Sequence, residues 1–481
     1  MPIGETRPLE RTRASPGCLS LSRWVGGSLV VLALGCGGAP TTPWDRDGGT
    51  TSVRKDAGTT SPTSTCLDQD GDGYAGSSGC PTGLDCDDSN PSIHPGATET
   101  LNGKDDDCDG KIDNHIAGHD SDGDGTAYPE DCNDDEPLIG PYAIEVLGDG
   151  VDNNCDGRID EAAPVACDTG SLGSSAADFA RAIGVCPLPP NAVFDGGVNL
   201  VKSAEFMTGG GKYAPAAARS IRATFGSQWV HTQGSKMALI STGKAIDQLD
   251  DASFSPQVGK DFNVSTTHPL YSPPRCAAPS TTPGAHDMTE LKIQLRVPQN
   301  ANSLSFQFNF FSAEYPEYVC TEFNDRFIVI LSSTGLHPAD LPNAGAGACV
   351  AGSTTPACNV SFDKNGQPVS INNAFFDVCA AASGSGWANA CTKSTSLLAQ
   401  TGYGSPDPFC SSDSYIGEAD CLIGGATGWL TTKAPVVPNE IITLRFIILD
   451  EGDGILDSAA LIDSFQWDTA TVTTPVTDPI G

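Results

Sequence analysis

The sequence predicts an all-β C-terminal domain, a β-sandwich with jelly-roll-like character, preceded by acidic repeats with little regular secondary structure. Three observations support this prediction. Apolar residues in the second half alternate with polar ones or form short β-rich runs. Residues 66–161 contain 26 Asp or Glu but only 3 Lys or Arg. This acidic segment also has few apolar residues, so it cannot bury a core that offsets its chain entropy and must be ordered by other bonds.

The N-terminal 35 residues have the features of an export signal. Arg residues precede the apolar run 24–34, which is too short to span a bilayer. The run leads into the sequence LALGC, which ends at Cys36 and resembles a bacterial lipobox. This resemblance implies that residues 1–35 are a lipoprotein signal peptide, that Cys36 carries the lipid, and that the following Gly37 directs the protein to the outer membrane. A plain signal peptide cleaved nearby is the alternative.

Residues 36–65 are rich in Gly, Thr, Ser and Pro and predict a flexible linker behind the lipid. The chain of 481 residues has a formal net charge of −34, which argues against nucleic acid and anionic lipid surfaces as binding partners. Loss of Cys18 with the signal and lipidation of Cys36 leave 16 of the 18 Cys residues in an oxidising compartment. Disulfides are therefore expected.

Four loops between residues 66 and 161 share the pattern D-x-[DN]-x-D-G. Oxygen ligands at alternate positions of a tight loop converge on one point, and calcium takes six to eight oxygens at about 2.3–2.6 Å. The Gly at the sixth position permits the sharp turn. The predicted ligands of the four loops, in order, are Asp68, Asp70 and Asp72; Asp105, Asp107 and Asp109; Asp120, Asp122 and Asp124; and Asp152, Asn154 and Asp156.

Further carboxylates are predicted to complete these loops. Asp131 falls at the twelfth position of the third loop, where a closing ligand is expected, and Asp113 and Asp160 fall at the ninth position of the second and fourth loops. The first loop has Gly79 at its twelfth position, so its closing ligand must come from elsewhere. The candidates are Asp85, Asp87 and Asp88.

The acidic segment is a tandem repeat with a unit of about 46–52 residues. In each unit one Cys follows the first loop and another lies inside the second loop, 22 or 23 residues later. This recurring spacing predicts the disulfides Cys86–Cys108 and Cys132–Cys155.

Residues 85–99 and 102–110 resemble the MopE-type metal-binding repeat of bacterial surface proteins, and the acidic loops also resemble thrombospondin type 3 repeats. The resemblance implies a surface protein that binds metal. Because the MopE family takes its name from a copper-associated protein, copper with His94, His115 and His119 as ligands is the alternative to several calcium ions. Oxygen-rich loops suit calcium better. A disordered acidic spacer is the third interpretation.

The second half predicts one short helix and several strands. Residues 176–183 form the helix, with Ser174 or Ser175 as cap and Gly184 as stop. Strands are expected at 291–297 and 304–310, where apolar residues alternate, and at the continuous apolar runs 327–331 and 441–449. Residues 335–435 read as a long insertion, and residues 469–481 as a tail. The pairing of eight Cys residues stays open: Cys276, Cys320, Cys349, Cys358, Cys379, Cys391, Cys410 and Cys421.

Residues 172–468 resemble the bacterial choice-of-anchor L domain. The residues that carry this resemblance lie in the segments 176–183, 240–243, 308–327, 368–376 and 449–458. The name of the family says only that the domain occurs in proteins with varied surface anchors. In this chain the resemblance implies that the N-terminal lipid is the anchor.

Grouped acids in the second half leave three interpretations open. Glu314 and Glu317 flank a Tyr-Pro turn near Asn324 and Asp325. Asp450, Asp453 and Asp457 follow one another at the end of a strand. These carboxylates can stabilise turns, hold one calcium ion between sheet edges, or serve as acid and base on a glycan.

No zinc-protease, nucleophile-elbow or phosphate-loop motif occurs in the sequence. We therefore predict a non-catalytic, calcium-binding protein that is lipid-anchored in the outer membrane, at its periplasmic face or at the cell surface. The repeats would act as a calcium-stiffened stalk that presents the β-sandwich for binding or adhesion to a glycan or a surface protein. The alternatives are copper acquisition and, third, a surface glycan hydrolase that uses Glu314, Glu317 or Asp325.

Overall fold

The computed structural model describes residues 66–77, 83–161, 167–168, 170–186, 200–208, 214–256, 261–271, 282–316, 318–319, 321–342, 348–372, 375–379, 391–404 and 424–480. Cys36, the predicted signal peptide and the predicted linker lie outside these residues, as do Gly79 and Glu317. Within the described part of residues 66–161 the chain runs through turns and bends, without a helix or a strand of its own. The loop-rich repeat segment is thus confirmed.

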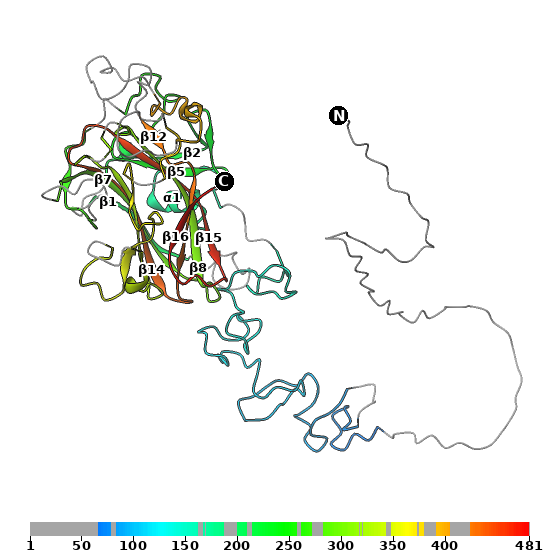
Figure 1. The fold of residues 1–481 in the computed structure, drawn as a ribbon. Coiled ribbons are helices and arrows are strands. Elements are labelled where there is room, and N and C mark those ends of the chain that lie inside the picture. The colour runs from blue at the N-terminus through cyan, green and yellow to red at the C-terminus, as the bar shows by residue number, and fades with distance from the viewer. Residues whose placement is uncertain are drawn as a thin grey trace, which may run out of the picture. The chain divides into compact units, whose positions relative to one another are not determined.

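The C-terminal part contains two antiparallel seven-stranded sheets (Figure 1). The first sheet has the order β1 (Val201–Met207), β7 (Ala285–Arg296), β14 (Ile441–Glu451), β9 (Arg326–Ser332) and β10 (Ala357–Asn359), with β6 (Ser265–Thr266) on β7 and β11 (Val369–Ser370) on β9. The second sheet has the order β16 (Val476–Pro479), β13 (Leu430–Pro435), β8 (Ser303–Ser312), β15 (Ser458–Asp468), β5 (Met237–Ser241) and β2 (Arg219–Arg222), with β12 (Gly425–Ala426) on β8.

Smaller elements connect and cover the sheets. The strands β3 (Thr224–Phe225) and β4 (Trp229–Val230) pair with each other. The helical elements are α1 (Ala176–Ala182) and the 3-10 turns η1 (Ala216–Ala218), η2 (Pro338–Asp340) and η3 (Thr395–Leu398). Four of the observed strands, β10, β11, β12 and β13, lie within the segment that the sequence analysis assigned to a long insertion.

The main core lies between the two sheets, and the hydrophobic periodicity of the strands explains why. In β7 the apolar residues at positions 291, 293 and 295 are fully buried, whereas the polar residues between them are partly exposed. Aromatic rings from facing strands meet in this core: Phe306 of β8 packs edge-on against Phe446 of β14, with ring centroids 5.1 Å apart. An alternating strand therefore buries one face against the other sheet. The prediction of an all-β sandwich is confirmed.

The strands with continuous apolar runs, β9 and β14, are buried on both faces. One face of each joins the main core through residues such as Val329 and Phe446. The other face joins a smaller apolar cluster that includes Ile328 and Ile447, together with Met288. The second cluster explains why these strands lack polar alternation.

The helix α1 begins where the sequence predicted. Ser175 caps it, because the Ser175 hydroxyl accepts a hydrogen bond from the Asp178 N–H while the Asp178 carboxylate accepts one from the Ser175 N–H. The chain turns away at Gly184, whose φ of +96° favours glycine. Phe179 anchors the helix, since it is 1 % exposed and its ring packs edge-on against Phe206 of β1.

Among the described residues of the C-terminal part, three disulfides form: Cys167–Cys186, Cys349–Cys358 and Cys379–Cys391. The last two disulfides pair four of the eight Cys residues whose partners the sequence left open. The other four Cys residues of that set lie outside the described residues: Cys276, Cys320, Cys410 and Cys421. Within the described residues, no helix has the length and apolar character that crossing a bilayer requires.

Candidate metal centre

Each of the four acidic loops is held in shape by its own carboxylates. In the first loop Asp68 accepts hydrogen bonds from the backbone N–H groups of Gly71 (2.6 Å) and Gly73 (3.0 Å). In the third loop Asp120 accepts the same two bonds from Gly123 (2.8 Å) and Gly125 (3.1 Å). The first Asp of a loop therefore uses its oxygens to close the turn, as an Asx turn does.

The second and fourth loops share a variant of this arrangement. Asp105 accepts from the N–H groups of Asp109 (3.1 Å) and Gly110 (3.0 Å), and Asp152 accepts from the corresponding N–H groups of residues 156 and 157. In all four loops the third predicted ligand is an Asp that accepts a hydrogen bond from the N–H two residues later. Local sequence alone thus builds one recurring turn.

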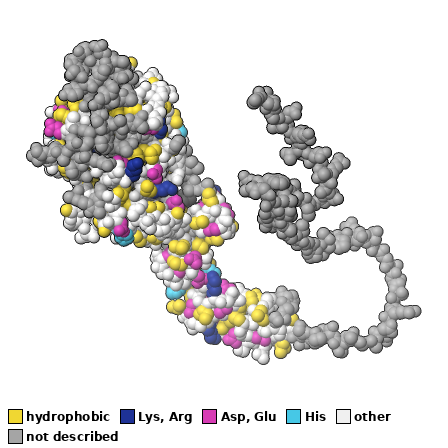
Figure 2. Space-filling view, in the orientation of Figure 1, with side chains coloured by type: hydrophobic (Ala, Val, Ile, Leu, Met, Phe, Trp, Pro, Cys, Tyr) yellow, Lys and Arg dark blue, Asp and Glu magenta, His cyan; other side chains and the backbone are white. Residues whose placement is uncertain are grey.

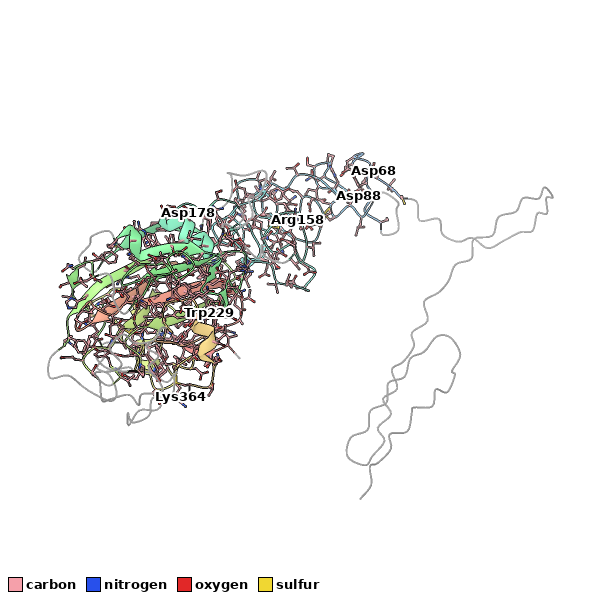
Figure 3. The ribbon with its side chains drawn as sticks, turned by 90° about the horizontal axis from the view of Figure 1, so that it is seen from above. Asp68, Asp88, Arg158, Asp178, Trp229 and Lys364 are labelled. Carbon is pink, nitrogen blue, oxygen red and sulfur yellow. A yellow bond between two sulfur atoms is a disulfide. The ribbon has the colours of Figure 1, made fainter. Side chains whose placement is uncertain are left out.

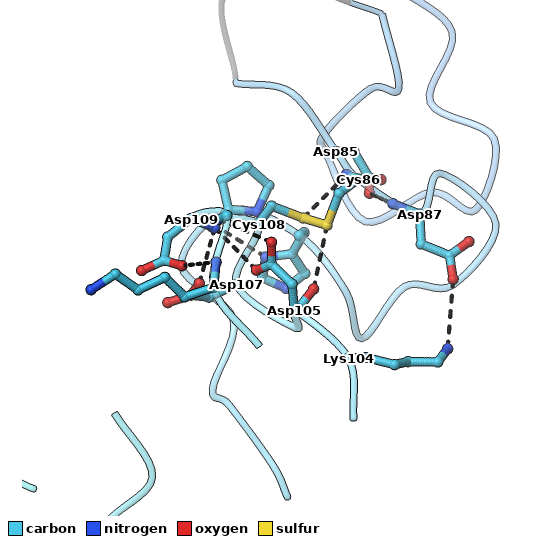
Figure 4. The surroundings of a disulfide bond; sticks show 12 residues. Asp85, Cys86, Asp87, Lys104, Asp105, Asp107, Cys108 and Asp109 are labelled. Atoms are coloured by element: carbon cyan, nitrogen blue, oxygen red, sulfur yellow. Dashed lines mark hydrogen bonds and ion pairs between the residues drawn. A yellow bond between two sulfur atoms is a disulfide. The ribbon is translucent and has the colours of Figure 1, made fainter. Parts of the chain in front are cut away.

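The structure forms both disulfides predicted for the repeats, Cys86–Cys108 and Cys132–Cys155. The first Cys of each bond directly follows Asp85 or Asp131. The second Cys lies inside the next loop. Figure 4 shows the first of these disulfides beside the three Asp residues of the second loop. The Cys86 N–H also donates to Cys108 Sγ (3.1 Å), and the equivalent bond from Cys132 to Cys155 is 3.0 Å long. The disulfides therefore fix neighbouring loops to each other.

Carboxylate oxygens converge in three of the loops. One oxygen from each member of a triad lies within 4.8 Å of the others, which is close enough for a shared cation. The triads are Asp68, Asp70 and Asp72; Asp105, Asp107 and Glu99; and Asp120, Asp122 and Asp124. Acidic side chains recur over the surface of the repeats, with few basic ones between them (Figure 2).

Several of these carboxylates have one oxygen that is buried and has no hydrogen-bond partner among the described residues. These oxygens are Asp70 Oδ2, Asp72 Oδ2, Asp85 Oδ2, Glu99 Oε2, Asp122 Oδ2, Asp131 Oδ2, Glu145 Oε2 and Glu161 Oε2. A buried carboxylate oxygen without a donor costs free energy. A cation in each loop would remove that cost, because it supplies the missing positive partner.

Asp85 and Asp131 occupy equivalent places, directly before the first Cys of each repeat, and close the first and third loops. Asp85 is 4 % exposed, and its charge contributes to raising the pKa of Asp70. Asp131 is fully buried. Burial, assisted by the charges of Asp124 and Asp122, raises the pKa of Asp131 to about 7. Both residues were predicted as ligands, and the structure brings them to their loops.

Four other predicted ligands accept hydrogen bonds from groups around the loops. Asp113 accepts hydrogen bonds from the backbone N–H groups of residues 102 and 103, and Asp160 accepts from those of 148 and 150. Asp87 accepts from the Ser89 hydroxyl, and Asp88 accepts from the Gln69 N–H at 3.0 Å. Figure 3 labels Asp88 beside Asp68 in the first repeat. These four carboxylates stabilise turns around the loops.

Glu99, Glu145 and Glu161 were missed by the sequence analysis. Glu99 accepts a hydrogen bond from the Asp107 N–H, and Glu145 accepts one from the Asn154 N–H, so each inserts into a loop from the preceding segment. Glu161 accepts from the Asn154 side chain. Burial raises the pKa of Glu99 and of Glu145. The available signal was that both Glu99 and Glu145 lie six or seven residues before the first Asp of their loop.

No two of the three histidines considered as copper ligands occur in one group of close metal-binding side chains. Only His115 shares a site with loop carboxylates, since it lies with Asp107 and Asp109 within ligand distance. His94 instead stacks on Tyr74, with ring centroids 4.9 Å apart. Among the described residues, His119 does not lie within ligand distance of two other metal-binding side chains. The donors gathered in the loops are therefore almost entirely oxygens.

The second repeat contacts the turn between β7 and β8. The Gln299 side chain donates to Asp124 Oδ2 at 2.7 Å, and the Gln299 N–H donates to the carbonyl of Tyr142 at 3.1 Å. Asn300 and Ile144 exchange two further hydrogen bonds, of 2.8 and 2.9 Å. A predicted ligand of the third loop is thus bonded directly to the β-sandwich.

The grouped acids of the second half are buried. Glu314 is 2 % exposed and Asp325 is fully buried, so neither reaches solvent where a glycan would bind. Asp450 and Asp457 are buried beside them, and Asp453 is partly exposed. Glu317 lies outside the described residues.

Tandem carboxylate loops followed by a disulfide-bonded β-sandwich define a metal-binding repeat protein with an all-β domain. Residues 85–114 and 131–161 match the family described as "Putative metal-binding motif", and residues 240–466 match the Choice-of-anchor L domain. Both resemblances seen in the sequence are thereby confirmed. Comparison with curated proteins and with solved structures gave no match. The two families indicate a bacterial cell-surface protein that binds metal, and neither is an enzyme family.

Proposed function

We propose that the acidic loops bind calcium and that the filled loops stiffen the repeats into a stalk. The observation that carries this proposal is the set of buried carboxylate oxygens without hydrogen-bond partners, together with the close approach of the carboxylates within the loops. Their donors are the hard oxygens that calcium prefers. Extracellular calcium modules bind with Kd values of about 0.1–1 mM. A tenfold excess of calcium over Kd would add about 1.4 kcal/mol of stability per site.

The stalk would present the β-sandwich to a glycan or to another surface protein, in a non-catalytic role. Lipidation at Cys36 would attach the chain to the outer membrane. Support for this part comes from the lipobox-like sequence before Cys36 and from the match to a domain family of anchored surface proteins. A Cys36→Ala variant would leave the membrane fraction if the lipid is the anchor. A variant that stays with the membranes and is lipid-free by mass spectrometry would refute the anchor.

Calorimetric titration of the chelator-treated full chain, first with calcium and then with copper, tests the metal. We expect several calcium sites and a parallel change in circular dichroism. Asp122→Asn should remove one site, because Asp122 Oδ2 is one of the partnerless oxygens. Asp135→Asn is the matched control, because Asp135 pairs with Lys111 on the surface and should leave the number of sites unchanged.

Copper acquisition is the second candidate, and one contact favours it: His115 lies with Asp107 and Asp109. That function predicts tight copper binding that His115→Ala abolishes, with no calcium binding. This result would replace the calcium proposal. Binding of neither metal would leave the repeats as an acidic spacer.

A further inference from the structure

Four buried carboxylates from both sheets meet inside the β-sandwich. Glu314 follows β8 and Asp457 precedes β15 in the second sheet, while Asp325 precedes β9 and Asp450 lies in β14 of the first sheet. None is more than 2 % exposed. The Ser458 hydroxyl at the start of β15 donates to Asp325 Oδ2 at 2.6 Å, which links the two sheets at this point.

The hydrogen bonds inside the cluster are unevenly distributed, and one carboxylate has none of good geometry. Asp325 accepts from Ser458 and from the Glu451 N–H, and Glu314 accepts from the Asp325 N–H. Both oxygens of Asp450, in contrast, are buried and form no hydrogen bond of good geometry, although the Thr242 hydroxyl lies close enough to favour its ionised form. A buried carboxylate in this state is strongly unfavourable unless it gains a proton or a positive partner.

Neutral polar groups lie near the cluster as well. The Tyr403 hydroxyl is buried and forms no hydrogen bond of good geometry, although the Ser241 side chain lies beside it; burial together with the charges of Asp457 and Asp450 raises the pKa of Tyr403. The Oδ1 atom of Asn324, next to Asp325 in the chain, is also buried and unpartnered. Both groups can supply neutral oxygen ligands.

The charge of the cluster is not balanced by the cation beside it. Arg326 is 1 % exposed and forms a two-pronged ion pair with Glu451, which is equally buried. Burial raises the pKa of Asp325 to about 7, and burial together with the charge of Asp325 raises the pKa values of Glu314 and Asp450 well above their usual range. The ionised carboxylates of the cluster therefore repel one another.

We propose that Asp450, with Asp325, Asp457 and Glu314, holds a hard divalent cation of the calcium class between the two sheets. An all-oxygen donor set selects calcium over zinc or copper. Among the described residues, no three of these carboxylates gather within 4.8 Å as the loop carboxylates do. Water therefore completes the coordination, as calcium permits. This site is separate from the repeat loops and does not depend on their function.

Calcium counting by equilibrium dialysis of the full chain tests the site with an Asp450→Asn variant. The substitution keeps the size of the side chain and removes its charge. We expect Asp450→Asn to bind one calcium ion fewer than the wild type. In chelator the variant should melt at a higher temperature than the wild type, because the repulsion is relieved; in calcium this advantage should disappear.

Asp463→Asn is the matched control. Asp463 is also a buried carboxylate of the β-sandwich, but its oxygens accept hydrogen bonds from Thr232 and Ser464. This variant should bind as many calcium ions as the wild type. A loop variant, Asp122→Asn, should lose a different ion, so that the double variant with Asp450→Asn loses both.

Equal calcium counts for the wild type and Asp450→Asn, with the variant more stable in chelator and in calcium alike, would overturn the proposal. The cluster would then hold protons in place of a cation. If Asp450→Asn does not fold, Tyr403→Phe gives a second test, because it removes only a hydroxyl. We expect Tyr403→Phe to weaken the binding of one calcium ion about tenfold or more. Unchanged calcium affinities would count against the site.

Discussion

Calcium binding at the third loop is expected to release a proton near neutral pH, and Asp131 is the source. Asp131 is fully buried in this loop, and burial raises its pKa to about 7. A calcium ion needs the ionised carboxylate, so binding must displace the proton that the metal-free protein holds. Asp131→Asn is the perturbation that removes this group, because an amide does not titrate.

The size of the effect follows from the pKa. With a pKa of about 7, Asp131 is protonated in about 0.9 of the metal-free molecules at pH 6, about 0.5 at pH 7 and about 0.1 at pH 8. The wild type should release that many more protons per calcium ion than Asp131→Asn. The calcium affinity of this loop should rise about tenfold from pH 6 to pH 8, because protons and calcium compete for one carboxylate.

In the absence of metal, the stability of the repeat depends on pH in the opposite direction from its calcium affinity. The folded protein holds a proton on Asp131 that the unfolded chain releases above its ordinary pKa, so the metal-free repeat should become less stable as the pH rises toward 7. Saturating calcium should abolish this trend, because the bound carboxylate is then ionised in the folded protein as well. Titration calorimetry in buffers of different ionisation enthalpy measures the protons released. Equal release by the wild type and Asp131→Asn at pH 6 would refute the assignment of Asp131 as a calcium ligand.

Three further outcomes are expected. Gln299→Met removes the side-chain donor to Asp124, so the calcium affinity of the third loop, measured by calorimetry, should fall about tenfold. An unchanged affinity would show that Gln299 does not orient Asp124. Replacing Cys132 and Cys155 by Ser should destabilise the second repeat by about 3 kcal/mol, measured by urea unfolding, because the disulfide closes a separation of 23 residues. Glu451→Gln should cost about 3–5 kcal/mol in the same assay, since it removes the negative charge from the buried ion pair between Glu451 and Arg326, and a loss below about 1 kcal/mol would contradict that reasoning.

Local features of this chain could be predicted from the sequence because short-range geometry determines them. The loop pattern specifies its own turn, since the Asp residues bond to N–H groups two to five residues later. The spacing of Cys86 and Cys108 recurs in the second repeat, so both disulfides could be predicted. The capping residue Ser175 and the alternation within β7 and β8 likewise act over a few residues.

Features that depend on the assembled fold could not be predicted. Glu99 reaches a loop that begins six residues later, and only the turn between them makes it a neighbour of Asp105. Asp113 accepts hydrogen bonds from the backbone N–H groups at 102 and 103, a contact that its distance from Asp105 along the sequence does not indicate. β15 was not predicted, because eight successive buried residues, with Asp463 among them, hide the alternation of a strand.

The contact between Gln299 and Asp124 joins residues 175 positions apart, and it connects the metal loops to the β-sandwich. Gln299 lies in the turn from β7 to β8, which passes from one sheet to the other. Gly140 lies against both Gln299 Nε2 and Asp131 Oδ2, so a side chain at this position would separate the loop from the turn. Coupling between two sites is reciprocal. If calcium fixes Asp124 in the orientation that Gln299 bonds, docking on the β-sandwich must strengthen calcium binding by the same factor.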